Sequence, residues 1–119
     1  MDQLPTLAAL SDLRLMRDLA ELAKQSKAVD EIERREQELR RFLAAETEAV
    51  ENLRGEEHVA ASVFTSFSSN TKRRLTAIHH QKMKAVEIEA TSLQDALRAQ
   101  GRSRAIASLQ KRAPAEQQV

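Results

Sequence analysis

Apolar and small residues recur at steps of three and four along the first fifty residues, which is the periodicity of one face of a helix. The recurring positions are Leu15, Leu19, Leu22, Ser26, Val29, Ile32, Glu36, Leu39, Leu43, Glu46, Val50 and Leu53. Two successive steps of three end at Ile32 and predict a stammer, which overwinds a coiled coil locally. Ser26, Glu36 and Glu46 are polar and would weaken the coil while fixing its register. We predict a first helix over about 5–54.

A second helix is predicted over about 57–112, before Pro114. Its apolar positions are Val59, Val63, Phe67, Thr71, Leu75 and Ile78, and then Met83, Val86, Ala90, Leu93 and Leu97. The turn is expected at 55–58, because Gly55 can take the left-handed conformation that ends a helix. Poor helix formers at 68–70 leave a break there as an alternative boundary, with Asn70 as the cap. The tail over 113–119 is expected to fray.

Two helices of nearly equal length predict an all-α fold, an antiparallel coiled-coil hairpin that makes a single domain of the 119 residues. Each arm would be about 75–80 Å long at 1.5 Å per residue. Composition agrees, because aromatic residues are 3% of the chain, charged residues are 31%, and there are only two Gly and two Pro. The pattern leaves open whether the hairpin closes on itself or opens into a self-associated dimer of longer helices.

The net charge of +1 hides an asymmetry between the two halves of the chain. Residues 1–59 carry 9 Lys/Arg against 14 Asp/Glu, whereas residues 60–119 carry 10 against 4. An acidic first helix and a basic second helix can lie side by side favourably, and exposed ion pairs of this kind govern orientation more than stability.

Catalytic and metal-binding patterns are missing from the chain. There is no cysteine, no Gly-rich phosphate loop and no nucleophile beside a base. Adjacent His79 and His80 point in different directions on a helix, and no carboxylate or Cys lies four residues away to complete a metal site. We predict a protein that is not an enzyme and that binds no metal, cofactor or small-molecule substrate. Without a membrane span or a signal pattern, a cytoplasmic location is expected.

Basic and aromatic residues meet in the first part of the second helix. Lys72, Arg73 and Arg74 are either a solvated face that pairs with the acidic helix or a contact for an acidic protein. Nucleic acid is not the expected partner, because the aromatic residues are not interleaved with the basic ones. Phe64 and Phe67 either pack near the hairpin end or anchor a partner protein.

A basic C-terminal stretch carries the most specific pattern. It reads Ala96-Leu97-Arg98, Gly101-Arg102, Arg104-Ala105, and Leu109 before Lys111-Arg112. This pattern resembles the C-terminal end of flagellar type III export stalk proteins, the FliJ type, and their injectisome counterparts. The chain is short for that family, and its serine-rich stretch over 65–71 departs from a continuous coil.

The resemblance implies a non-catalytic stalk that couples the export ATPase to the export gate. In such proteins the joined helix ends insert into the pore of the hexameric export ATPase, and the other end reaches toward the gate, a membrane protein. Arg98, Arg102, Arg104 and Arg112 would contact the ATPase. For the contact with the gate, the sequence suggests Phe64, Phe67 and Leu75 by their position and not by a motif. The chain would then lie in the cytoplasm, at the inner face of the cell membrane through its partners. The alternative is a generic coiled-coil adaptor.

Overall fold

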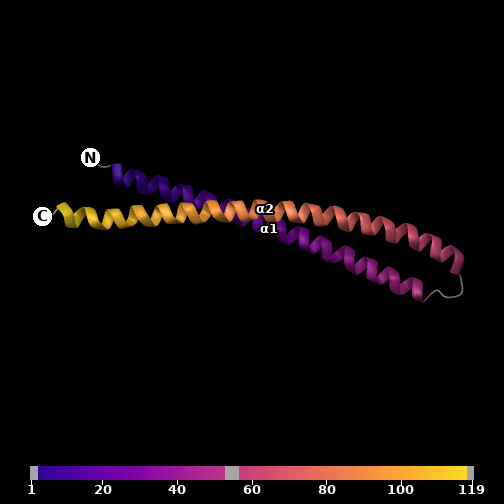
Figure 1. Cartoon of the computed structure of the whole chain (residues 1–119). Helices are drawn as coiled ribbons and strands as arrows, with labels where there is room; N and C mark the ends of the chain where they lie inside the picture. Colours follow the sequence, from indigo (N-terminus) through magenta and orange to yellow (C-terminus); the bar gives the residue numbers. More distant parts are fainter. Residues whose placement is uncertain (1–2, 53–56, 118–119) are drawn as a thin grey trace. The chain divides into compact units, whose positions relative to one another are not determined.

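The computed structural model describes the backbone over residues 3–52 and 57–117, and the side chains over 3–52 and 65–112. Within these ranges the chain forms two helices, α1 (Gln3–Glu51) and α2 (Glu57–Gln117), which pack against each other (Figure 1). The predicted all-α helical hairpin is therefore confirmed. Neither helix contains, in its described part, a stretch long and apolar enough to cross a membrane.

The helix ends differ from the expected ones at several points. The end of α1 is closed by Asn52, whose backbone N–H donates to the carbonyl oxygen of Glu48 at 3.2 Å. The predicted break near Asn70 is wrong, because α2 continues through it. Thr71 is buried there, so packing outweighs the weak helix propensity of its neighbours. α2 also continues to Gln117, past the predicted end at 112. The predicted Gly55 turn falls largely outside the described residues.

Burial along α1 follows an unbroken alternation of three and four residues. The partly or fully buried stripe, here called the seam, consists of Leu4, Ala8, Ser11, Leu15, Asp18, Leu22, Gln25, Val29, Ile32, Glu36, Leu39, Leu43, Glu46 and Val50. The predicted stammer is not needed, because Gln25, Val29 and Ile32 continue the alternation, with Ser26 partly buried beside Gln25. The predicted seam position at Leu19 is wrong, since the structure has Asp18 there. Leu19 is 49% exposed. A coiled coil keeps its heptad register even where a polar residue holds a seam position.

The seam of α2 is equally regular but differs from the predicted one. It consists of Ser68, Thr71, Leu75, Ile78, Lys82, Ala85, Glu89, Ser92, Ala96, Ala99, Ser103, Ile106 and Gln110. The predicted stripe that begins at Met83 is wrong by one position, and its large members are exposed. Small residues such as Ala96 and Ala99 take the seam instead. They leave room for the leucines of α1, because large side chains facing small ones fill the space between helices.

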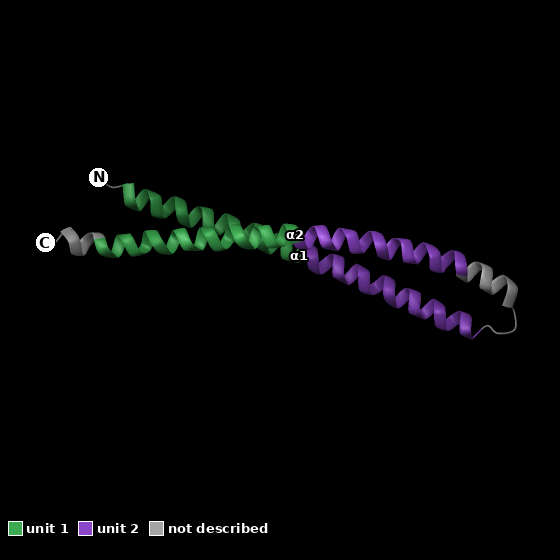
Figure 2. Ribbon diagram, viewed as in Figure 1, with its two compact units in different colours: residues 1–27, 87–119 green, residues 28–86 purple. Residues whose placement is uncertain are grey.

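The chain divides into two compact units, and each unit pairs one segment of α1 with one segment of α2 (Figure 2). Unit 1 comprises Met1–Lys27 and Glu87–Val119. Unit 2 comprises Ala28–Val86. In unit 1, the hydroxyl of Ser103 donates to Asp12 Oδ1 at 2.8 Å and ties the two segments together.

In unit 2, charged residues link the acidic segment of α1 to the basic segment of α2. Lys82 Nζ lies 3.9 Å from one carboxylate oxygen of Glu33 and 3.9 Å from Oε1 of Glu36. Glu36 is only 8% exposed, and its Oε1 also lies 3.1 Å from Nη2 of Arg40. His79 Nδ1 lies 4.0 Å from Glu36 Oε2. The seam carboxylate is thus surrounded by basic groups from both helices.

Candidate protein-binding site

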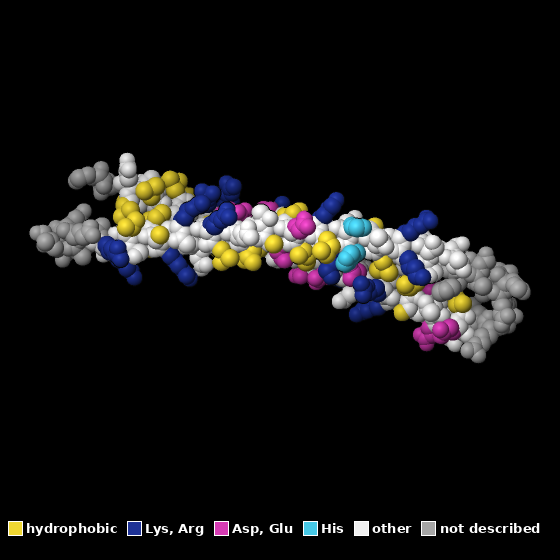
Figure 3. Space-filling view, in the orientation of Figure 1, with side chains coloured by type: hydrophobic (Ala, Val, Ile, Leu, Met, Phe, Trp, Pro, Cys, Tyr) yellow, Lys and Arg dark blue, Asp and Glu magenta, His cyan; other side chains and the backbone are white. Residues whose placement is uncertain are grey.

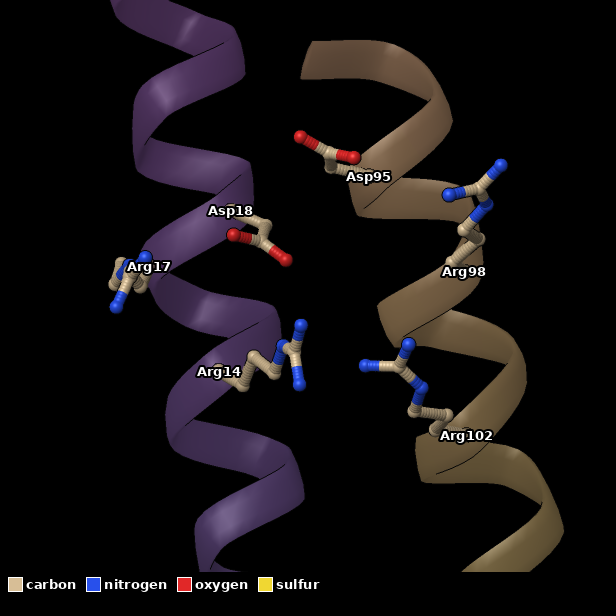
Figure 4. Close-up of a pocket in the computed structure, with 6 residues that line it drawn as sticks. All are labelled: Arg14, Arg17, Asp18, Asp95, Arg98 and Arg102. Carbon is tan, nitrogen blue, oxygen red and sulfur yellow. The ribbon is translucent and has the colours of Figure 1, made fainter. Parts of the chain in front are cut away.

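Unit 1 contains a groove in which arginines from both helices gather. Figure 4 shows its six lining residues, which are Arg14, Arg17, Asp18, Asp95, Arg98 and Arg102. We call this site the arginine groove. It combines four guanidinium groups with two carboxylates.

Helical spacing brings these side chains to one side of unit 1. Residues three or four apart share a helix face, which places Arg14 near Arg17 and Arg98 near Arg102. In Figure 4, Arg14 and Arg102 point toward one another across the space between the helices. Asp18 is directed into the same space, whereas Arg17 points away from it. The groove therefore presents an inner pair of guanidinium groups with further charges at its edges.

The arginines of the groove keep their charges unpaired. Within the described part of the chain, none of the four has a carboxylate oxygen within 4.0 Å. By contrast, Arg35 and Arg40 of unit 2 each make an ion pair with a glutamate four residues earlier. Guanidinium groups that face one another with no carboxylate at ion-pair distance repel, and an arriving carboxylate would relieve that repulsion. Arginine binds carboxylates well because its planar fork can donate two parallel hydrogen bonds.

The predicted site residues fall at different places. Arg98 and Arg102 line the arginine groove. Arg104 and Arg112 are exposed and are not among its lining residues. The C-terminal sequence pattern predicts one contact surface for all four arginines, but only two of them line the groove.

The three residues predicted for the gate contact are also separated. Phe67 is half exposed, as an anchor for a partner would need to be. Leu75 lies on the seam of α2 and is partly buried, so its side chain serves the packing of the hairpin. The side chain of Phe64 lies outside the described residues. A contact between these residues and a partner stays a prediction.

Sequence reasoning missed Arg14 and Arg17, the contribution of α1 to the groove. Counting residues from the turn would not have found them, because Arg14 lies 37 residues before the end of α1 and Arg102 lies 45 residues after the start of α2. In the structure these two residues line the same groove, and Asp12 and Ser103 form the hydrogen bond across unit 1. The level at which the two helices pair is therefore not given by the sequence.

Metal chemistry finds no support in the described side chains, where no three His, Asp or Glu residues lie close enough together to hold an ion. His79 faces the carboxylate of Glu36, and His80 is exposed. In unit 2, Lys82 and His79 of α2 therefore lie beside carboxylates of α1, whereas the arginines of the groove have no carboxylate oxygen within 4.0 Å among the described residues.

The fold and the groove define a class, that of antiparallel helical hairpins with a charged groove. Comparison of the chain with protein-family models, with curated proteins and with solved structures finds no match. The functional argument therefore depends on the geometry of the chain itself.

Proposed function

We propose that this chain is a non-catalytic helical hairpin that binds an acidic surface of a partner protein through the arginine groove of unit 1. The observation that supports this proposal is the gathering of four arginines from two helices in one groove without an ion pair inside the described part of the chain. A groove of this kind recognises carboxylates whose spacing matches its guanidinium groups.

A protein partner is favoured over nucleic acid by the composition of the groove. Asp18 and Asp95 lie among the arginines and would repel any anion beside them, so the groove suits separate carboxylates with hydrogen-bond donors between them better than the continuous charge of a phosphate backbone. The lining residues include no aromatic side chain on which a base could stack. Unit 1 as a whole carries nine basic and eight acidic residues, a nearly neutral balance. The positive charge is therefore local, as a specific protein contact requires.

The resemblance to export stalk proteins indicates which partner to test first. In this proposal the hexameric export ATPase supplies the acidic surface and Arg98 and Arg102 contact it, so the binding part is unit 1, which holds both chain termini, and not the joined helix ends that the resemblance implies. The export gate is the second partner. The chain would then act in the cytoplasm, at the inner face of the cell membrane through these partners. A coiled-coil adaptor would use the same groove for a different acidic protein.

The test is a binding titration of the full chain against three labelled probes: an oligo-glutamate peptide, a purified export ATPase and a short DNA duplex. The groove variant is R98E/R102E. The matched control is R73E/R74E, which makes the same change in charge on exposed residues of unit 2. Neither control arginine has an ion-pair partner among the described residues.

The proposal predicts that the peptide binds, that R98E/R102E weakens this binding by about tenfold or more, and that the control leaves it nearly unchanged. Binding of the ATPase with the same dependence would support the stalk function, and binding of the peptide alone would support the adaptor. Equal losses in both variants would show a diffuse charge effect and contradict the groove. Binding of DNA alone would replace the proposal with a nucleic-acid function.

A further inference from the structure

A second groove in unit 1 is apolar. Its walls are formed by Leu15, Leu19 and Leu22 of α1 and by Leu93, Ala96 and Leu97 of α2, with the polar Gln100 beside them. It shares no residue with the arginine groove, because each groove follows a different side of the line along which the two helices meet. Figure 3 shows hydrophobic side chains reaching the surface of unit 1. We call this side of unit 1 the apolar face.

Large aliphatic side chains on the apolar face remain open to solvent. Leu19 is 49% exposed, Leu93 46% and Leu97 57%, and Met16, one turn from Leu19, is 67% exposed. A two-stranded coiled coil needs only a narrow stripe of two apolar positions per heptad. Unit 1 has that stripe and, beside it, a further one. A helix with a wider apolar stripe is typical of a bundle, in which each helix contacts two neighbours.

The exposed apolar residues of α2 in unit 1 have a regular spacing of their own. Ala90, Leu93 and Leu97 follow steps of three and four, parallel to the buried stripe of Ser92, Ala96 and Ala99. The small residues pack against α1, and the larger residues point elsewhere. The stripe with the larger apolar residues is therefore not the one that contacts α1. A second apolar stripe of this kind suits a second helix–helix contact.

We propose that the apolar face is covered by a second copy of this chain, so that two copies of unit 1 form an antiparallel four-helix bundle. With the twofold axis parallel to the helices, α1 of one copy lies beside α2 of the other at the same level. Every pair of neighbouring helices is then antiparallel, and the face is complementary to itself, as a twofold interface requires.

Charges at the two ends of the apolar face support a second copy as the occupant. At one end Asp12 of α1 and Arg104 of α2 lie beside the apolar positions, and at the other end Lys27 of α1 and Glu87 of α2 lie on the outer sides of the helices, each two residues after a seam residue. At each end the two helices therefore have opposite signs, so a twofold arrangement brings Asp12 beside the partner's Arg104 and Lys27 level with the partner's Glu87. Within the described part of the chain, none of these four forms an ion pair. A lipid surface would not call for this alternation of signs.

This inference is independent of the proposed function, because the dimer leaves the arginine groove uncovered. The test is sedimentation of the full chain over a range of concentrations. The interface variant is Leu97→Glu, and its matched control is Leu10→Glu, which places the same charge at an exposed leucine of α1 outside the groove. Circular dichroism establishes that each variant keeps its helices.

We expect the chain to sediment as a dimer, with twice the chain mass of 13.4 kDa. Leu97→Glu should raise the dissociation constant by about tenfold or more, and Leu10→Glu should leave it nearly unchanged. Lys27→Glu should raise it by about fivefold, and adding Glu87→Lys should restore it. Lys27 and Glu87 are exposed and do not hold the hairpin together. The charge exchange between them therefore still tests the proposal if Leu97→Glu unfolds the chain. A monomer at every concentration, or a dimer broken by Leu10→Glu but not by Leu97→Glu, would overturn the proposal.

Discussion

Unit 1 and unit 2 have the same architecture but use their side chains in opposite ways. In unit 2 the α1 seam holds Val29, Ile32, Leu39, Leu43 and Val50, and Lys82 pairs with carboxylates across the two helices. In unit 1 the α2 seam holds small residues, and nine of the thirteen large hydrophobic residues that are exposed among the described side chains belong to this unit. Among the described residues, unit 2 therefore places a lysine of α2 beside carboxylates of α1, whereas unit 1 leaves most of the large exposed apolar side chains and the arginines of the groove open to solvent.

The difference teaches that a heptad pattern identifies a helical hairpin without identifying which side chains are free to bind. Both units have an unbroken seam. What separates them is the size of the seam residues and whether a charge finds its counter-charge on the neighbouring helix. In such a protein we expect binding where the seam residues are small and where a charge has no counter-charge on the neighbouring helix.

The largest effect on stability should come from filling the close contact of unit 1. Ala99 is 2% exposed, so Ala99→Leu forces extra volume between the helices and should lower the free energy of unfolding by about 1–3 kcal/mol. Ala105→Leu, at an exposed position of the same helix, is the control and should change it by less than about 0.5 kcal/mol. Urea denaturation followed by circular dichroism measures both. Equal effects would contradict the seam described for α2.

The contribution of α1 to the arginine groove gives the next prediction. Arg14→Glu should weaken binding of the oligo-glutamate peptide by about tenfold, as much as a change at Arg102, which it faces across the groove. Arg14 lies far from the C-terminal pattern in the sequence, so a purely C-terminal binding segment would not respond to it. Unchanged binding in a fluorescence anisotropy titration would remove α1 from the site.

Replacing the seam carboxylate Glu36 of unit 2 should raise the free energy of unfolding, whereas Ala99→Leu should lower it. Glu36 is buried, and its Oε2 makes no hydrogen bond, so replacing it with leucine removes a desolvated charge from a seam position. Lys82 and His79 are partly or largely exposed and can turn to water. Glu36→Leu should therefore raise the free energy of unfolding by about 1 kcal/mol. A large loss in thermal denaturation would show instead that the ion pairs hold unit 2 together.

The smallest effect is expected at Phe67. Half of its surface is exposed, so Phe67→Ala should change the free energy of unfolding by less than about 0.5 kcal/mol. Ile78, partly buried on the seam of the same helix, is the comparison, and its replacement by alanine should cost about 2 kcal/mol. Similar losses at both positions would place Phe67 in the packing of unit 2 and not at an interface.

The helical hairpin was predictable from the sequence because composition, periodicity and two segments of equal length all favour it. Which face of each helix contacts the other helix was harder to predict. Apolarity alone selected Leu19, Leu93 and Leu97 for the seam, whereas the structure buries Asp18, Ser92 and Ala96. A one-dimensional pattern cannot separate two parallel apolar stripes on one helix, because the choice between them depends on which stripe the neighbouring helix fits.

The candidate site was predictable only in part for a related reason. Arg98 and Arg102 stood out because they lie close together in the sequence. Arg14 and Arg17 belong to the other helix, and their part in the groove depends on the level at which the helices pair. Arg104 lies on another face of α2, and Arg112 lies farther along the helix beyond the groove, so neither lines it.

The central claim is that α2 turns small residues toward α1 and leaves its leucines outside in unit 1. Because the chain has no cysteine, single variants Ala99→Cys and Leu97→Cys can be labelled with a thiol reagent at a dilution that keeps the chain monomeric. The account predicts that Ala99→Cys reacts at least about tenfold more slowly than Leu97→Cys in the folded chain, and at the same rate in denaturant. Faster reaction at position 99 than at position 97 would contradict it.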